Sequence, residues 1–371
     1  MTERFDVVVI GAGMAGASLG AAIAPAARVL LIEAEERAGM HATGRSAALY
    51  APGYGSGPIR VLTLASKAVF YAPPSDPSAT PLVTPRPSLM VAKAEQGPRL
   101  EAIWKADPET FDPVDAATAE RMVPVLRPGL VRSALIDRQS ADIDVDALHQ
   151  TYLRAFRRDG GAVALGEPVL GLHAVSGGWR VVTSQREIGA TVVVNAAGAW
   201  ADAVAASAGL DRIGLQPKRR TAALVDAPAV AGFADWPMVI DVEERFYFKP
   251  DAGRLLVSPA EETDVDPHDA YADDEALAEG IDRIAQLTTI EVTRAPRAWA
   301  GLRTFAPDRV PVIGFDPRAE APFFWLAGQG GYGIQTAPAI AALAATQILG
   351  QAAPTFSDRA LTDALSPERF R

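Results

Sequence analysis

Gly11, Gly13 and Gly16 form a GxGxxG motif, a spacing that can bind the diphosphate of a dinucleotide. The first glycine permits a tight turn, the second lets a pyrophosphate approach the backbone, and the third lets a helix pack closely on a strand. Glu33 follows 17 residues after Gly16 and can accept hydrogen bonds from ribose hydroxyls. The free N–H groups at the N-terminus of the helix would hold the diphosphate. This unit alone leaves both NAD and FAD open as the nucleotide.

The motif is specific only where it joins a strand to a helix, and the neighbouring residues meet that condition. Residues 5–10 (FDVVVI) are a β-branched run typical of a buried parallel strand. An alanine-rich helix is expected from the motif to about residue 24, where Pro25 ends it. Residues 27–33 (ARVLLIE) predict a second strand, which completes a strand–helix–strand unit.

The chain has 371 residues, which is long for one hydrophobic core. Patterns of the dinucleotide-binding type occur near its beginning, middle and end, and short strands with turn signals lie between them. We therefore predict an α/β fold with an α+β inserted domain. The cofactor domain would combine residues 1–50, 140–214 and 296–371, and a substrate domain with an antiparallel sheet would combine residues 51–139 and 215–295.

The composition excludes several classes of function. The 35 Lys and Arg residues are outnumbered by 45 Asp and Glu residues, and the net charge of −10 disfavours nucleic acid as a partner. The chain has no cysteine, so it can form neither thiolate metal sites nor a cysteinyl–flavin link. Its four histidines do not indicate a multi-histidine metal centre, and we expect no metal.

Residues 7–27 carry no charge and could suggest a membrane span or a signal peptide. This stretch contains the glycines of the motif and Pro25, and it divides into a β-branched half and an alanine-rich half. No other segment of the sequence is long and apolar enough to span a membrane. We therefore expect a soluble, cytoplasmic protein.

Further motifs follow in order along the chain. They are GMHATGRSAA at 39–48, NAAGAW at 195–200, GLR at 301–303, PDRVPVIG at 307–314 and GQGGYG at 328–333. This ordered set resembles the D-amino-acid oxidase superfamily of FAD enzymes, and the resemblance covers essentially the whole chain. Within that superfamily, FYFKPDAG at 246–253 and QGGYGIQT at 329–336 resemble the bacterial D-arginine and D-amino-acid dehydrogenases.

The resemblance implies a Rossmann domain of the glutathione-reductase type that binds FAD noncovalently. The residues implied around FAD are Gly11, Gly13, Ala15, Gly16, Glu33, Ala34, His41, Thr43, Arg45, Ser46, Ala47, Val169, Ala197, Gly198, Gly301, Gly330, Gly331, Gly333, Ile334, Gln335 and Thr336. A glycine-rich loop before a helix places N–H donors beside the flavin pyrimidine ring, where negative charge develops on reduction. Because some relatives link flavin covalently through a histidine of the first loop, attachment through His41 stays open.

The resemblance also implies the reaction, which is oxidation of an amine carbon next to a carboxylate. A hydride passes from Cα to flavin N5, and the imino acid is hydrolysed to a 2-oxo acid and ammonia. Arg220 and Arg303 are the implied carboxylate clamp, since arginine presents a planar fork that matches a carboxylate. Strand alternation turns either Arg219 or Arg220 outward, and the resemblance selects Arg220. We expect Arg220 at the start of a strand and Arg303 in a turn after one.

Three other groups are expected at the reacting end. Tyr247 can donate its phenol hydroxyl to the substrate carboxylate, and Tyr54, in a glycine-rich loop, resembles a lid tyrosine. The carbonyl of Gly331 would accept a hydrogen bond from the substrate amine. No histidine base is expected, and direct hydride transfer from the neutral amine is the simpler mechanism.

The side-chain pocket departs from the pattern of D-arginine dehydrogenases. Ser88 stands where they have an acidic residue, and Leu49 and Ala51 stand where they have a histidine and a threonine. Tyr332 is the fourth residue expected in this pocket. A guanidinium buried here would lack a partner, so we expect neutral or apolar D-amino acids as substrates.

Two alternatives stay open. One is a secondary-amine oxidase for sarcosine-like or glycine-like substrates, a branch that carries a lysine near flavin N5. The five lysines of this chain lie outside the flavin motifs, which favours a dehydrogenase with a quinone or other electron acceptor. The second alternative is a flavoprotein module of an RNA-modifying enzyme, which the net charge of −10 disfavours.

Overall fold

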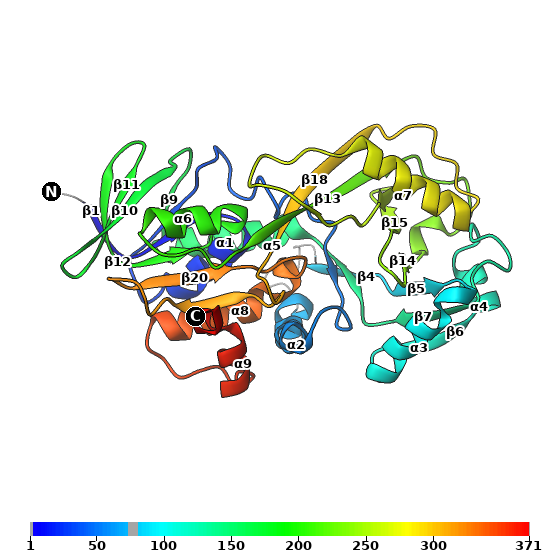
Figure 1. Ribbon diagram of the computed structural model, residues 1–371, viewed down its shortest axis with the longest axis horizontal. Helices are drawn as coiled ribbons and strands as arrows, with labels where there is room; N and C mark the ends of the chain where they lie inside the picture. Colours follow the sequence, from blue (N-terminus) through cyan, green and yellow to red (C-terminus); the bar gives the residue numbers. More distant parts are fainter. Residues whose placement is uncertain (1–2, 73–80, 371) are drawn as a thin grey trace.

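The computed structural model describes residues 3–72 and 81–370. Two large sheets occupy opposite ends of an elongated molecule, and the N-terminus lies at the end with the eight-stranded sheet (Figure 1). The strands of that sheet come from three separate stretches of the chain. They are β1 (Glu3–Ile10), β2 (Val29–Ile32), β9 (Ala162–Ala164), β10 (Val169–Val175), β11 (Gly178–Thr183), β12 (Glu187–Asn195), β19 (Val312–Phe315) and β20 (Phe323–Ala327).

The centre of this sheet is parallel, with the order β9-β2-β1-β12-β20. β1 is buried on both faces, because Val7 and Val9 belong to one apolar cluster and Val8 and Ile10 to another. Two-sided burial explains why the strand reads as a continuous apolar run. The helices on the two faces are α1 (Met14–Ile23), α5 (Val145–Arg158) and α8 (Gly333–Ile348) on the first, and α6 (Ala201–Ser207) on the second. The expected strand–helix–strand unit, β1-α1-β2, is confirmed.

The nine-stranded sheet is antiparallel except for the parallel pair of β5 and β14. Its strands are β5 (Ser88–Ala92), β6 (Asp112–Asp115), β7 (Ser133–Asp137), β13 (Gln216–Val225), β14 (Met238–Asp241), β15 (Tyr247–Asp251), β16 (Arg254–Ser258), β17 (Thr263–Asp264) and β18 (Arg297–Phe305). Helix α7 (Asp274–Leu287) packs Leu277 and Ile284 into the apolar cluster of this sheet. The mixed α/β fold class predicted from the sequence is confirmed.

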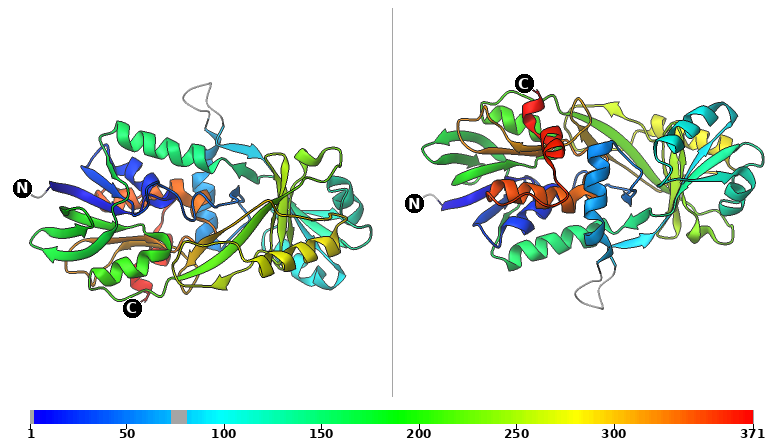
Figure 2. Two further views of the ribbon diagram at one scale, coloured as in Figure 1. Left: turned by 90° about the horizontal axis from the view of Figure 1, so that it is seen from above. Right: turned by 90° about the horizontal axis from the view of Figure 1, so that it is seen from below.

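The remaining elements lie between and around these two sheets. A three-stranded sheet contains β3 (Leu49–Tyr50), β8 (Ala141–Ile143) and β4 (Val83–Pro85). The other helices are α2 (Gly57–Tyr71), α3 (Gly97–Ala106), α4 (Ala116–Met122) and α9 (Arg359–Leu365), with 3-10 turns η1 (Ala94–Gln96), η2 (Gly198–Trp200), η3 (Phe233–Asp235) and η4 (Pro367–Phe370). Helix α2 packs against α8 in the middle of the molecule (Figure 2).

The position of β18 does not agree with the domain boundary expected at residue 296. It pairs with β13 along its whole length, so residues 297–305 belong to the nine-stranded sheet. Sequence patterns can mark a strand, but its partner is set by residues far away in the chain. Arg303 consequently lies inside β18 and not in a turn, and Arg220 lies inside β13 and not at its start.

Within residues 3–72 and 81–370, no helix is long and apolar enough to cross a membrane. In that part of the chain, no group of three or more His, Asp or Glu side chains is placed to hold a metal ion. His149 is instead buried beside the glycine motif, with its Nε2 2.9 Å from the carbonyl oxygen of Ala12.

Gly16→Ala should destabilise the fold, because a Cβ at this position would lie 1.9 Å from the carbonyl oxygen of Gly11. Overpacking costs roughly 1–3 kcal/mol, and here the obstacle is backbone, so we expect a loss near the upper end. The free energy of unfolding from urea denaturation measures it. Gly97→Ala is the matched control, since a Cβ there meets nothing within 4 Å and the residue has helical φ of −51°. Equal losses in both variants would contradict the close packing at Gly16.

Candidate active site

A cavity of about 790 Å³ extends from the carboxyl ends of β1 and β2 to the nine-stranded sheet. Ligand pockets usually occupy about 300–1,000 Å³, so this one is large enough for an extended ligand. The carboxyl ends of parallel strands are also where open α/β sheets bind nucleotides. The cavity has two chemically different ends, one formed by glycine-rich segments and the other by arginines and tyrosines.

The glycine end has the shape that a dinucleotide needs. Gly11 has φ of +104°, and a Cβ there would lie 2.5 Å from the carbonyl oxygen of Ala196, so only glycine fits. Glu33 reaches across the motif, where its Oε2 accepts the N–H of Ala12 at 2.9 Å. Gly13 lines the cavity at the N-terminus of α1, the helix end that binds phosphate groups. The residues present therefore fit the diphosphate and ribose of a dinucleotide.

All but three of the residues expected around FAD line the cavity; Gly16, Gln335 and Thr336 do not. Gly16 packs α1 against the backbone of Gly11, the residue that follows β1. The side chain of Gln335 accepts the N–H of Ala51 at 3.0 Å, and the hydroxyl of Thr336 donates to a backbone carbonyl one turn earlier at 2.8 Å. Both side chains are buried inside the protein, so they stabilise the start of α8 and do not face a ligand.

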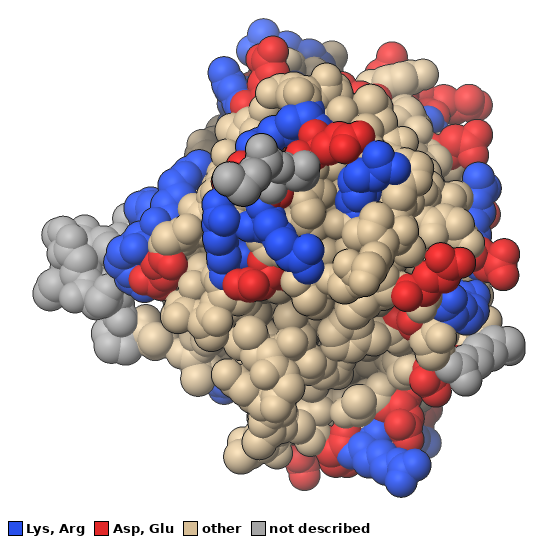
Figure 3. All heavy atoms as spheres, turned by 90° about the vertical axis from the view of Figure 1, so that its left-hand side faces the viewer, with Lys and Arg blue, Asp and Glu red and all other residues tan. Residues whose placement is uncertain are grey.

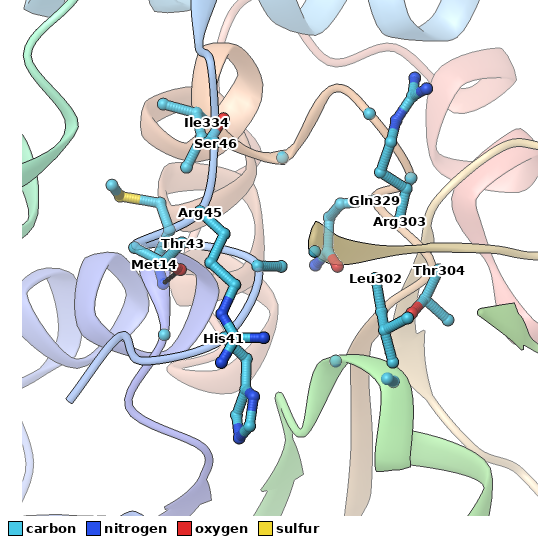
Figure 4. Close-up of a pocket in the computed structure, with 18 of the residues that line it drawn as sticks. Met14, His41, Thr43, Arg45, Ser46, Leu302, Arg303, Thr304, Gln329 and Ile334 are labelled. Carbon is cyan, nitrogen blue, oxygen red and sulfur yellow. Dashed lines mark hydrogen bonds between the residues drawn. The ribbon is translucent and has the colours of Figure 1, made fainter. Parts of the chain in front are cut away.

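One wall of the cavity is the loop of residues 39–48. Thr43 Oγ1 accepts the N–H of Met14 at 2.9 Å, which attaches the loop to the start of α1. Arg45 Nη1 donates to the carbonyl oxygen of Ala300 in β18 at 3.1 Å, which attaches the loop to the opposite wall. Figure 4 shows the labelled residues of the loop on one side of the cavity and those of β18 on the other.

His41 lies in this loop and lines the cavity. Its Nε2 is 2.9 Å from Glu35 Oε1, and its Nδ1 is 3.9 Å from Asp269 Oδ1. The imidazole ring also packs against the indole of Trp200, with 4.6 Å between the ring centroids. Both ring nitrogens therefore face carboxylates of the protein.

Arg303 lies at the centre of the second end of the cavity, the end formed by arginines and tyrosines. Its Nη2 donates to the hydroxyl of Tyr54 at 2.8 Å, and its Nη1 lies 3.3 Å from Glu262 Oε1. A Cβ at Gly331 would lie 1.8 Å from Nη2, so the guanidinium occupies space that only glycine leaves free. Burial opposes the charged form, but Tyr54, Glu262 and Tyr247 outweigh it and raise the pKa of Arg303.

Arg219 and Arg220 have different surroundings, as strand alternation predicts. Arg220 lines the cavity and donates from Nε to the carbonyl oxygen of Glu261 at 2.8 Å. Its guanidinium carbon lies 6.0 Å from the ring centroid of Tyr247, which also lines the cavity. Arg219 pairs with Asp273 and does not line the cavity. Arg220 is thus the one of the two that shares the cavity with Arg303.

Of the four residues expected in the side-chain pocket, Leu49, Ala51 and Ser88 line the cavity and Tyr332 does not. The ring of Tyr332 packs 4.9 Å from that of Tyr54, and burial raises its pKa to about 12. Tyr332 therefore supports Tyr54 from outside the cavity. The sequence indicates only that the glycine-rich loop approaches the site, and the packing decides which side each residue takes.

Sequence reasoning missed the apolar residues of the same pocket. Met90 on β5, together with Met238 and Ile240 on β14, lines the cavity beside Phe111 and Phe246. Met238 and Ile240 are two residues apart in β14, and this spacing in the sequence was a signal that they share one face of a strand. Phe111 precedes β6 and gave no such signal.

Asp137 also lines the cavity and was not expected there. It is 1% exposed and lies opposite Ser88 in the pairing of β5 with β7. Its carboxylate accepts the N–H of Gln139 at 2.8 Å and the hydroxyl of Ser140 at 3.0 Å, and burial raises its pKa. These donors belong to the turn that follows β7, so the carboxylate is held by the protein itself.

The chain resembles curated enzymes over part of their length. It is 29% identical to the tRNA 5-methylaminomethyl-2-thiouridine biosynthesis bifunctional protein MnmC of Caulobacter sp. (strain K31), over 98% of this chain and 57% of that protein. It is 25% identical to mitochondrial dimethylglycine dehydrogenase of Homo sapiens, over 60% of this chain and 28% of that protein. The matches therefore span 28% and 57% of the lengths of these two relatives.

Two solved structures share the fold. Glycine oxidase from Geobacillus kaustophilus has a TM-score of 0.83 and 22% identity, and the match covers 97% of this chain and 98% of that one. L-proline dehydrogenase from P. horikoshii has a TM-score of 0.84 and 20% identity, and the match covers 100% of this chain and 98% of that one. At these identities the likeness shows the fold alone.

The sequence profile of the family described as FAD dependent oxidoreductase matches residues 6–347. The match runs from β1 almost to the end of α8, and so includes the glycine motif, the loop of residues 39–48 and the strands β13 and β18, which carry Arg220 and Arg303. The chain therefore belongs to the FAD dependent oxidoreductase family, and its cofactor is FAD.

Proposed function

We propose that this protein is a D-amino-acid dehydrogenase that forms an imino acid, which water converts to a 2-oxo acid and ammonia. The observation that carries the proposal is the pair Arg220 and Arg303 at one end of a cavity whose other end fits a dinucleotide. FAD, bound noncovalently, supplies the acceptor for the hydride from the substrate Cα. A quinone or another carrier takes up the electrons afterwards.

The side chains at the arginine end bind and orient the substrate. The two guanidinium forks hold its carboxylate, and the hydroxyl of Tyr247 donates to the same group. Tyr54, held by Arg303 at 2.8 Å, covers the carboxylate and excludes water. The carbonyl of Gly331 accepts a hydrogen bond from the amine. These anchors fix two substituents of Cα, so that one enantiomer places its hydrogen toward the cofactor.

The walls beyond the clamp support a substrate with an uncharged side chain. Met90, Ile240 and Phe111 offer apolar surface, and Ser88 offers one hydroxyl, which lies 3.3 Å from that of Ser140. The carboxylate of Asp137 beside Ser88 already accepts hydrogen bonds from Gln139 and Ser140. Burying a guanidinium against this surface would therefore cost free energy. Neutral or apolar D-amino acids are therefore the proposed substrates.

The lysines support a dehydrogenase over an oxidase. All five belong to the part of the chain that the structure describes, and none of them lines the cavity. Lys249 is 4% exposed with its Nζ 2.5 Å from Asp142 Oδ1, and Lys218 pairs with Asp264. Neither lysine is free to approach a flavin.

A secondary-amine oxidase is the second candidate, and the similarity to dimethylglycine dehydrogenase favours only its substrate class, an N-methylated amino acid. The same clamp would bind the carboxylate of an N-methyl amino acid. The two proposals therefore differ in whether the substrate carries a primary or an N-methylated amine. Anaerobic mixing with D-alanine, L-alanine or sarcosine, followed by loss of flavin absorbance, compares them directly. Faster bleaching by sarcosine than by D-alanine would support the second candidate.

The similarity to MnmC raises the RNA-modifying alternative, which charge disfavours. Binding an RNA backbone needs a cationic surface, whereas this chain has a net charge of −10. On the face shown in Figure 3, basic side chains lie among acidic ones and form no extended basic patch.

Acid denaturation should release FAD into the supernatant, because both ring nitrogens of His41 face carboxylates of the protein. The absorption spectrum of the supernatant after centrifugation measures the released fraction. Flavin that remains with the precipitated chain would contradict noncovalent binding, and His41→Ala would then test the point of attachment.

Arg303→Ala and Arg220→Ala should each lower kcat/KM for the best D-amino acid by roughly 30- to 1,000-fold. Losing a charge-assisted contact to a carboxylate costs about 2–4 kcal/mol, which corresponds to that range. FAD content, measured by absorbance, should stay unchanged. Arg219→Ala is the matched control, because this neighbouring arginine pairs with Asp273 outside the cavity. Near-normal kcat/KM in either clamp variant would remove that arginine from the clamp.

Wild-type enzyme should have a higher kcat/KM for D-methionine than for D-arginine, and Ser88→Glu should narrow or reverse that preference. The new carboxylate would supply the charge-assisted partner that the guanidinium lacks. The ratio of the two kcat/KM values is the measurement. Thr84→Glu adds the same charge at an exposed position that does not line the cavity, and it should leave the ratio unchanged. A wild-type preference for D-arginine would contradict the proposed pocket.

A further inference from the structure

Glu262 contacts both clamp arginines from outside the cavity wall. Its Oε1 lies 3.3 Å from Arg303 Nη1 and 3.5 Å from Arg220 Nη2. Arg309 pairs with both carboxylate oxygens, Nη1 with Oε2 at 2.9 Å and Nη2 with Oε1 at 3.0 Å. Arg220 and Arg303 line the cavity, whereas Glu262 and Arg309 do not. One carboxylate therefore joins three guanidinium groups.

The charges in this cluster do not cancel. Glu261 is the second carboxylate beside Arg220, and its Oε1 accepts the N–H of Thr221 at 2.6 Å. Burial raises the pKa of Glu261; burial also acts on Glu262, but Arg309 and Arg303 outweigh it and lower that pKa. With both carboxylates ionised, the three arginines keep one positive charge in excess. A single substrate carboxylate would neutralise it.

We propose that Glu262 sets the charge and the spacing of the clamp, so that the site accepts ligands with one carboxylate and disfavours those with two. The inference rests on the proposed function, which assigns Arg220 and Arg303 to the substrate carboxylate. Glu262 acts through these arginines, so it is a positioning residue that determines specificity. Monocarboxylic amino acids are the substrate class that this balance selects, and dicarboxylic ones are disfavoured.

The neighbouring contacts allow the charge of Glu262 to be changed while the clamp keeps its shape. Arg303 retains its hydrogen bond to Tyr54, and Arg220 retains its hydrogen bond to the carbonyl oxygen of Glu261. A glutamine at position 262 would still offer one oxygen to the arginines. Glu262→Gln therefore removes a negative charge with little change in volume.

The test is the binding of propionate and malonate to the FAD-loaded enzyme at pH 8, followed by the change in the flavin absorption spectrum. Glu262→Gln should strengthen the binding of malonate relative to propionate by roughly tenfold in the ratio of the two Kd values. The buried charge of Glu262 lies several ångströms away and repels both carboxylates of a dianion. KM for D-alanine should change more than kcat. The control is Glu279→Gln, which makes the same charge change in an exposed pair with Arg283; it should leave the ratio unchanged.

A second variant changes the net charge of the same cluster in the opposite direction. Arg309→Gln removes a positive charge outside the cavity wall and should weaken the binding of malonate relative to propionate. This variant decides the question even where Glu262→Gln fails to retain FAD. Opposite shifts in the two variants support the proposal, and an unchanged ratio in both overturns it.

One further measurement separates this inference from the proposed function. Wild-type enzyme should bind propionate more tightly than Arg303→Ala does. Equal binding by these two proteins would overturn the clamp itself, and the inference with it. Tight binding by wild type together with unchanged ratios in Glu262→Gln and Arg309→Gln would overturn the role of Glu262 alone.

Discussion

The hydrogen bond between β18 and the glycine-rich loop before α8 joins the two ends of the candidate site. The N–H of Gly330 donates to the carbonyl oxygen of Thr304 at 2.8 Å. Arg303 and Gly331 are the chain neighbours of these two residues, so this hydrogen bond holds Arg303 beside the glycine-rich loop. Arg303 then positions Tyr54, and the pairing of β13 with β18 places Arg220 on the neighbouring strand. The remaining geometry of the site depends on this junction.

The same junction explains why glycine occupies consecutive positions in the loop. Gly330 has φ of +53°, and a Cβ there would lie 2.2 Å from the ring of Phe305. At Gly331 the guanidinium of Arg303 takes the place of a side chain. A glycine-rich sequence suggests close approach to a ligand, but here it is also required by the approach of β18. The shape of the cavity and the packing of β18 therefore constrain the same two glycines.

Local features of the fold could be predicted from the sequence, and features that depend on distant residues could not. The β1-α1-β2 unit was predictable because an apolar run, a glycine motif and Pro25 lie next to one another. The pairing of β18 with β13 was not, because nothing near residue 297 identifies its partner. Tyr332 and Gln335 are buried in the protein and do not line the cavity, because they contact Tyr54 and Ala51, which lie far away in the chain. Glu262 was missed because its three arginine partners lie on different segments.

The long separations within the eight-stranded sheet have a consequence for synthesis of the chain. Glu3 pairs with Ile188 across β1 and β12, and Val193 pairs with Phe323 across β12 and β20. Proteins emerge from the ribosome N-terminus first, so β1 cannot pair with β12 until roughly half of the chain has been translated. Parallel pairings of such high contact order form slowly and leave apolar strand edges open to aggregation meanwhile. Translation rate and chaperone supply should therefore govern the yield of correctly folded protein, since the glycine-rich loop that lines the cavity directly follows β20.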